Sequence, residues 1–177
     1  GASLFIGDGN LFLNAGLFSP GGIGTLMTTE LIGDYIGTDA SSLLFDLQFD
    51  HGNDAYDMLD VSGTVLLDGT LVLNLIGTQH IMPGTWEHVL VTGSGGITDN
   101  GIELVVPDSA VISYELFALS DFEHVLRYSV DFSPDGLVGN YGAFGEHINN
   151  IQLAGGSDEL DSLVMMLAGL PEDDQLK

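Results

Sequence analysis

Residues 57–75 constrain the fold more than any other part of the chain, because three short apolar runs follow one another there with only Ser62-Gly63 and Asp68-Gly69 between them. In the third run every second residue is a leucine, which is the period-two pattern of a strand with one face in a core. Small turn-forming residues between runs of about five residues predict strands joined by sharp bends. The pattern indicates an all-β stack or sandwich and argues against a helical enzyme.

The same pattern extends over most of the chain and predicts further strands. They are expected at residues 4–6, 11–13, 25–28, 31–36, 43–50, 86–92, 102–106, 111–118 and 125–132. The run at 31–36 is interrupted by Gly33-Asp34. The alternation at 43–50 predicts a core face and a polar face, with Phe45, Leu47 and Phe49 on the first and Asp46, Gln48 and Asp50 on the second. In 125–132 the core face is predicted to hold Leu126, Tyr128, Val130 and Phe132.

The Asp68-Gly69 pair is compatible with two topologies. Between alternating runs it is a strong signal for an antiparallel hairpin. The corner between two strands of a parallel solenoid also favours glycine after a small polar residue, so the sequence leaves both open. A solenoid has to cover its ends, so a hairpin near one terminus would make a suitable cap.

The apolar period lengthens after the turn predicted at residues 133–136. Phe144, Ile148 and Ile151 have helical spacing and predict one amphipathic helix. Ser157 is expected to cap a second helix, with Asp158 and Glu159 in its first turn. The apolar face of this second helix is expected to consist of Leu160, Leu163, Val164 and Leu167. The sequence thus divides into strands over 1–136 and, over 137–177, two short helices with an acidic tail.

Composition excludes several functions. The chain has 177 residues, enough for one domain with its own core, and 26 Asp and Glu against 2 Lys and Arg, for a net charge of −24. Phosphate contacts need basic side chains, so nucleic acid and anionic membrane surfaces are not expected partners.

With no cysteine there can be no disulfide or thiolate chemistry. No apolar run approaches the ~20 residues of a membrane helix. The chain begins at Gly1, without methionine, and reads as an excised or processed fragment.

Carboxylates provide the one chemical lead. Asp54, Asp57 and Asp60 recur every third residue, and Asp8 and Asn10 flank a turn glycine. Such oxygens could bind a divalent cation, although neither group matches a known calcium loop and such residues usually close turns. Two alternative functions therefore stay open, namely a calcium-dependent adhesin or carbohydrate-binding module and a β-helical glycan-active enzyme. The second would require paired carboxylates in a cleft.

No catalytic, cofactor-binding or metal-binding residue is predicted. The histidines are not spaced as a zinc site; they are His51, His80, His88, His124 and His147. His88 alternates with Trp86 and Leu90, which predicts a partly buried strand residue. There is no nucleophile-elbow motif and no P-loop, and the glycine-rich stretch 93–96 is expected to be a flexible turn.

Several motifs in order resemble the passenger domains of bacterial autotransporters. Residues 19–26 read SPGGIGTL, which is similar to the SPG-x-IGTL signature of that family. Elements similar to further family motifs follow in the family's order. GDY stands at 33–35, SLLFDL at 42–47 resembles the family's S-x-L-x-F-x-L strand, and residues 57–71 match D-x-L-x-V-x-G-x-x-x-L-x-G-x-L. Residues 85–96 resemble the Y-x-L-L-T-A-x-G-G-I strand and loop, with Trp86 for the usual tyrosine and Val91-Thr92-Gly93 before the glycine pair. Residues 140–144 and 163–171 resemble the helical linker that precedes the translocator barrel.

This resemblance implies a right-handed parallel β-helix, with or without a capping hairpin, followed by one or two short helices. Residues 1–136 would form the passenger stem with its autochaperone region, and 137–177 the linker toward an absent barrel. The implied function is structural and non-enzymatic, without a cofactor: to assist folding and export through the outer membrane to the cell surface. The implied partners are its own translocator barrel and upstream rungs, with host or surface ligands through the full passenger. The fragment itself would not insert into the membrane.

Overall fold

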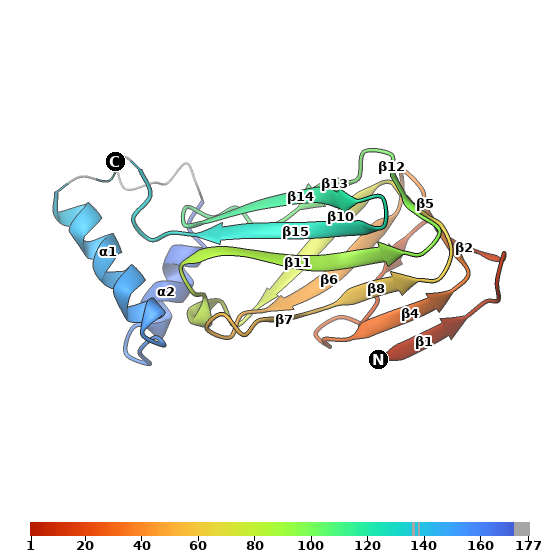
Figure 1. Ribbon diagram of the computed structural model, residues 1–177. Helices are drawn as coiled ribbons and strands as arrows, with labels where there is room; N and C mark the ends of the chain where they lie inside the picture. The colour runs from red at the N-terminus through yellow and green to blue at the C-terminus, as the bar shows by residue number, and fades with distance from the viewer. Residues whose placement is uncertain (136, 138, 172–177) are drawn as a thin grey trace.

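The computed structural model describes residues 1–135, 137 and 139–171 (Figure 1). The chain forms a right-handed parallel β-solenoid of four turns with two short helices, which confirms the predicted fold class. Each turn contains three strands separated by tight corners, as the short apolar runs predict. Gly136, which ends one predicted turn, and the acidic tail at 172–177 lie outside the described residues.

Equivalent strands of successive turns pair in parallel to form three sheets. Turn 1 consists of β1 (Ala2–Phe5), β2 (Leu11–Asn14) and β3 (Leu17–Phe18), and turn 2 of β4 (Thr28–Ile32), β5 (Asp34–Gly37) and β6 (Ser42–Gln48). Turn 3 consists of β8 (Met58–Val61), β9 (Val65–Leu67) and β10 (Thr70–Ile76), and turn 4 of β11 (Gly84–Gly93), β12 (Ile97–Asp99) and β13 (Glu103–Val105). The two-residue strand β7 (Ala55–Tyr56) runs antiparallel to β6, and a short 3-10 helix, η1 (Thr78–His80), precedes β11.

The core lies inside the solenoid, where in-register residues of neighbouring turns stack on one another. Between turns 2 and 3 the stacked pairs are Leu31–Val61, Tyr35–Val65 and Leu43–Leu71. All six side chains are almost completely buried. The alternation seen in the sequence is therefore the alternation between the inside and the outside of the solenoid.

Asp68-Gly69 is a solenoid corner. The strands on either side, β9 and β10, belong to different sheets, and each pairs in parallel with the turns before and after it. Gly69 has φ of 78°, and a Cβ there would lie 2.3 Å from the carbonyl oxygen of Ser41. The glycine is required by the close approach to the previous turn as well as by the backbone conformation.

A hairpin extends the first sheet beyond turn 4, as the prediction of a terminal cap allowed. Its strands are β14 (Ile112–Ser120) and β15 (Glu123–Val130), and β15 lies between β11 and β14, antiparallel to both. Leu126, Tyr128 and Val130 are buried on its inner face, as the alternation predicted. The outer face carries Arg127, which pairs with Glu87 and Glu115 of the flanking strands at 2.7 and 2.8 Å.

Two helices, α1 (Asn140–Leu153) and α2 (Asp161–Ala168), lie beyond the strand ends on the side of η1 (Figure 1). Ile148, Val164 and Ala168 belong to the same hydrophobic cluster as the strand residues. No helix among the described residues is long and apolar enough to span a membrane. The helical segment is thus packed onto the solenoid and shares its core.

Both helices are present, and the apolar face predicted for the second one packs on the core, with Val164 buried and Leu160, Leu163 and Leu167 partly buried. Ser157 does not cap α2, which begins only at Asp161, so that Asp158 and Glu159 precede its first turn. In α1, Ile148 is buried as predicted, but Phe144 is 49% exposed, and Gly145 and Gln152 complete the buried face. A Cβ at Gly145 would lie 2.1 Å from the carbonyl oxygen of Phe132. This close backbone approach decides which face of the helix turns inward.

Candidate interaction site at the open end of the solenoid

The first turn has an interior that is only half covered. Its inward-facing residues Leu4, Phe12 and Phe18 are partly exposed. The residues in register with them in turn 2 are completely buried, namely Leu31, Tyr35 and Leu43. The difference arises because turn 2 has a neighbour on both sides, whereas turn 1 has one only on the side of turn 2 within the described chain.

Aromatic rings form the floor of this open end. The ring centroid of Phe12 lies 5.0 Å from that of Phe18 and 6.0 Å from that of Tyr35, on which it stacks. The side-chain amide of Asn14 donates to the Tyr35 hydroxyl group at 3.0 Å. Burial raises the pKa of Tyr35 above its ordinary value. The layer is therefore well ordered on its inner side while its outer side remains available for contact.

The edges of all three sheets coincide at this end. In the described part of the chain, β1, β2 and β3 are each paired on one side only. Unpaired strand edges present free backbone donors and acceptors and favour the addition of another strand. Turn 1 also carries most of the large apolar side chains that the solenoid strands expose, which are Phe5, Leu11, Leu13 and Leu17. We call turn 1, residues 1–18, with its edges and half-covered interior, the open end.

At the opposite end the hairpin continues the first sheet beyond β11, whereas β12 and β13, the other two strands of turn 4, are each paired on one side only in the described chain. The hairpin β14–β15 places Leu126, Tyr128 and Val130 at 0%, 1% and 3% exposure. These side chains pack in one cluster with partly buried residues of turn 4 such as Leu104. The solenoid therefore has two chemically different ends.

Two buried carboxylates fasten the loop between turns 1 and 2. Asp46 lies on the polar face of β6, opposite the core residues Phe45 and Leu47, and accepts hydrogen bonds from the backbone of Gly24 at 2.6 Å and Thr25 at 3.0 Å. The loop covers this face, so Asp46 is completely buried, which the alternation did not predict. Asp57 accepts from the backbone of Met27 at 2.7 Å and of Asp46 at 3.0 Å. Burial raises the pKa of Asp57, while these hydrogen bonds oppose the shift. The motif at 19–26 thus packs against residues of two later motifs.

The same contacts explain why the strand predicted at 25–28 begins only at Thr28. The backbone N–H groups of Thr25 and Met27 donate to carboxylates and not to a neighbouring strand. At another corner, Asp34 accepts from the backbone and hydroxyl groups of Thr64 at 2.6 and 2.9 Å, and these bonds lower the pKa of Asp34. A Cβ at Gly63 would lie 2.2 Å from this carboxylate, which accounts for the glycine there.

The acidic residues at 54, 57 and 60 do not converge. Asp54 accepts a short hydrogen bond from the Tyr128 hydroxyl group, whereas Asp60 accepts from Thr92 at 2.6 Å. Asp8 is exposed, and Asn10 closes its turn by donating to the carbonyl oxygen of Ile6 at 2.8 Å. Across the described residues, no group of three or more His, Cys, Asp or Glu side chains is placed to hold a metal ion.

The histidines occupy four different environments. His51 and His80, which the sequence did not connect, form a hydrogen-bonded pair with ring nitrogens 3.1 Å apart. His88 is a half-buried strand residue, as predicted, between the rings of Tyr56 and Tyr128. The remaining two differ in exposure: His124 is buried near Asp99 and His147 is exposed on α1.

The buried histidines predict a pH-dependent stability. Burial lowers the pKa of both His88 and His124 below the ordinary value of 6.5. As the pH falls below 6.5, the unfolded chain takes up protons that the folded chain does not, so the stability that these groups contribute is present above this pH and is lost below it. We expect the free energy of unfolding to fall as the pH is lowered from 7.5 to 5.5, by no more than about 1.4 kcal/mol per pH unit for each histidine. Denaturant unfolding at several pH values measures it.

The control for this experiment is the double variant His88→Phe/His124→Phe, compared with His147→Gln on the exposed helix face. Asp57, whose pKa is raised in the folded protein, also contributes to the pH dependence of stability. It is present in both proteins, so the difference between wild type and the double variant isolates the contribution of the two histidines. An equal pH dependence in all three proteins would show that these histidines do not couple protonation to folding.

Comparisons with protein-family models, with curated proteins and with solved structures returned no match. The site is therefore interpreted from its own geometry and from the motifs in the sequence.

Proposed function

We propose that this chain is the membrane-proximal stem of a secreted autotransporter passenger, a non-enzymatic module on which the rest of a β-helix is built. The observation that supports the proposal best is the difference between the two ends of the solenoid. The open end presents three unpaired edges and a half-covered apolar layer, whereas at the other end the hairpin occupies the place beside β11 and leaves only the edges of β12 and β13 in turn 4 unpaired within the described chain. Further rungs of the same β-helix are the occupant that fits all of these features at once.

The energetic argument follows from the nearest-neighbour character of solenoids, in which each turn is stabilised by the turn beside it. A further rung would pair the edges of β1, β2 and β3 simultaneously. It would also complete the burial of Leu4, Phe12 and Phe18, and full burial of such a side chain contributes about 1.5–3 kcal/mol. Because the hairpin occupies the position beside β11 where the first strand of a further rung would pair, folding that starts in this module would propagate from the open end.

The order of the sequence motifs over residues 19–171 supports the autotransporter part of the proposal. In such a protein the segment containing α1 and α2 would lead to the translocator barrel, and the solenoid would lie outside the cell. The absence of cysteine suits a chain that passes unfolded through a narrow pore. The module would assist passenger folding during export across the outer membrane.

The test places this chain between a β-helical upstream passenger and a translocator barrel in a Gram-negative host. Phe12→Asp changes the inner face of the open end, and Leu13→Asp changes the neighbouring outward residue, which is 58% exposed. We expect the passenger with Phe12→Asp to reach the surface but to be digested by added protease. The passenger with Leu13→Asp should stay as resistant as wild type, since its side chain does not contact the next rung.

Denaturant unfolding of the isolated chain, followed by circular dichroism, accompanies this test. It shows whether Phe12→Asp leaves turns 2–4 and the hairpin folded, so that protease sensitivity can be assigned to the passenger and not to collapse of the module. Equal protease resistance of the two variants would contradict the stacking function.

A further inference from the structure

The hairpin strand β14 has a free edge at the end of the solenoid opposite to the open end. The first sheet ends with this strand, and over the described ranges no segment pairs with its outer side (Figure 1). β14 is nine residues long. A free edge of this length carries several unpaired backbone donors and acceptors, which an extended peptide can satisfy by adding a strand.

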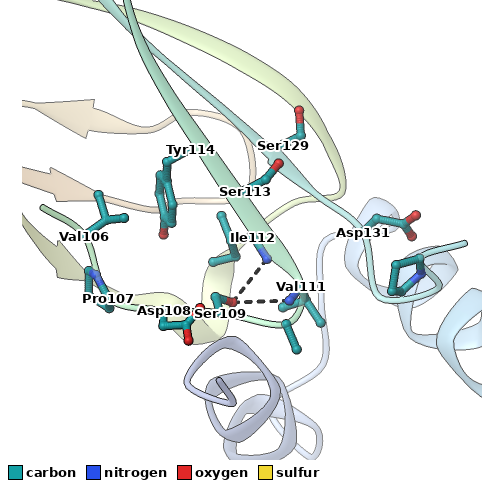
Figure 2. A pocket seen from close by; sticks show the side chains of 12 residues that line it. Val106, Pro107, Asp108, Ser109, Val111, Ile112, Ser113, Tyr114, Ser129 and Asp131 are labelled. Carbon is teal, nitrogen blue, oxygen red and sulfur yellow. Dashed lines mark hydrogen bonds between the residues drawn. The ribbon is translucent and has the colours of Figure 1, made fainter. Parts of the chain in front are cut away.

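A pocket of about 450 Å³ adjoins the first residues of this strand (Figure 2). It lies between the 106–111 segment, β14 and the chain after β15. Its apolar wall contains Val106, Pro107 and Val111. The hydroxyl oxygen of Tyr114, which also lines the pocket, is buried and has no hydrogen-bond partner in the part of the chain that the structure describes. Its volume suits one or two side chains of a bound segment.

The pocket wall is held in a defined shape. The Ser109 hydroxyl oxygen accepts hydrogen bonds from the backbone of Val111 at 3.3 Å and of Ile112 at 3.1 Å (Figure 2). The backbone N–H group of Ala110 donates to the carbonyl oxygen of Leu170 at 2.7 Å, which ties the segment to the helical side of the molecule. A preformed wall of this kind reduces the ordering that binding requires.

Charge identifies the kind of segment that fits. Asp108 and Asp131 line the pocket, and the whole chain has a net charge of −24. Arg127, the only arginine, is already paired with Glu87 and Glu115. A second copy of this acidic chain would bring like charges together, whereas a segment with basic residues would meet complementary charge along the strand.

We propose that β14 binds an extended peptide segment in which basic and apolar residues alternate, with one apolar side chain in the pocket. The segment adds to the sheet as a seventh strand beside β14, and its basic side chains face Asp108 and the surrounding acidic surface. This interaction uses the capped end of the solenoid and does not depend on the stacking of rungs at the open end.

Fluorescence anisotropy with the full chain tests the proposal. The probe is a labelled peptide of alternating lysine and valine, of the same length as β14, and two control peptides replace either lysine by glutamate or valine by serine. We expect saturable binding of the first peptide only. Equal binding of the lysine–serine peptide would reduce the interaction to general charge attraction and would overturn the proposal.

Two matched variants place the site. Asp108→Lys reverses an exposed charge at the pocket, and Asp39→Lys reverses an exposed charge at a corner of turn 2. We expect Asp108→Lys to weaken binding roughly fivefold, the order of effect of exposed charge pairs, and Asp39→Lys to weaken it less than about twofold. Amide chemical-shift changes should centre on residues 112–120. Shifts centred on β1, the other free edge of the same sheet, would contradict the proposed site.

Discussion

Leu126→Ala is expected to lower the free energy of unfolding by about 3–5 kcal/mol. Leu126 is completely buried in the central strand of the hairpin, in register with His88 of β11 and Leu116 of β14. Truncation removes the apolar contact and leaves a cavity that strands paired on both sides cannot close. The effect should appear as a lower denaturant midpoint with an unchanged slope, since the hairpin and the solenoid share one core.

Leu119→Ala is the matched control for this variant. Leu119 lies in β14 of the same hairpin and is 55% exposed, so the same change of side chain there should cost less than about 0.5 kcal/mol. A small effect of Leu126→Ala, or a separate early transition, would mean that the hairpin folds independently of the solenoid. The hairpin and the solenoid would then not form a single cooperative unit.

Asp46→Ala should cost about 2–4 kcal/mol, because it removes a buried acceptor from several donors at once. Besides the backbone of Gly24 and Thr25, the Asn74 side chain donates to this carboxylate at 2.5 Å. Without the carboxylate, the loop at residues 19–27 loses two of the hydrogen bonds that hold it to the solenoid. We expect both a lower stability and faster cleavage of this loop by a nonspecific protease.

Two further variants separate the causes. Asp46→Asn keeps the size of the side chain but turns one acceptor into a donor, and should destabilise the protein nearly as much as alanine. Asp39→Ala removes an exposed carboxylate from turn 2 and should have little effect. If Asp39→Ala were as damaging as Asp46→Ala, overall charge and not the local hydrogen bonds would control stability.

The strands were predictable because their signal is local. Alternating leucines such as those of β10 have to face a core, whichever strand pairs with them, and the glycines at bends such as Gly69 mark the corners. Parallel pairing could not be derived at Asp68-Gly69 itself, because a hairpin and a corner require the same two residues. The resemblance to passenger domains supplied the topology that local periodicity left open.

The contacts that the sequence did not reveal join residues one turn apart. His51 and His80 are separated by 29 residues, close to the 28-residue offset between Ser42 and Thr70 in paired strands. A search for residues at that offset could have connected the histidines. Asp46 is different, because the loop residues that donate to it lie 21 and 22 residues earlier in the chain, an offset that differs from the 28 residues between paired strands. Alternation therefore predicted the polar face on which Asp46 lies, but not its burial.

The central position of β15 also determines how the protein bears a mechanical load. Tension applied at Pro171 would act first on α2 and α1, which are held to the solenoid by side-chain packing of Ile148, Val164 and Ala168. After these helices detach, the tension would run along β15, whose hydrogen-bond ladders to β11 and β14 are then loaded together in shear. Under a force applied from the C-terminal side, α1 and α2 would detach first, while the hydrogen-bond ladders of β15 would keep the solenoid folded.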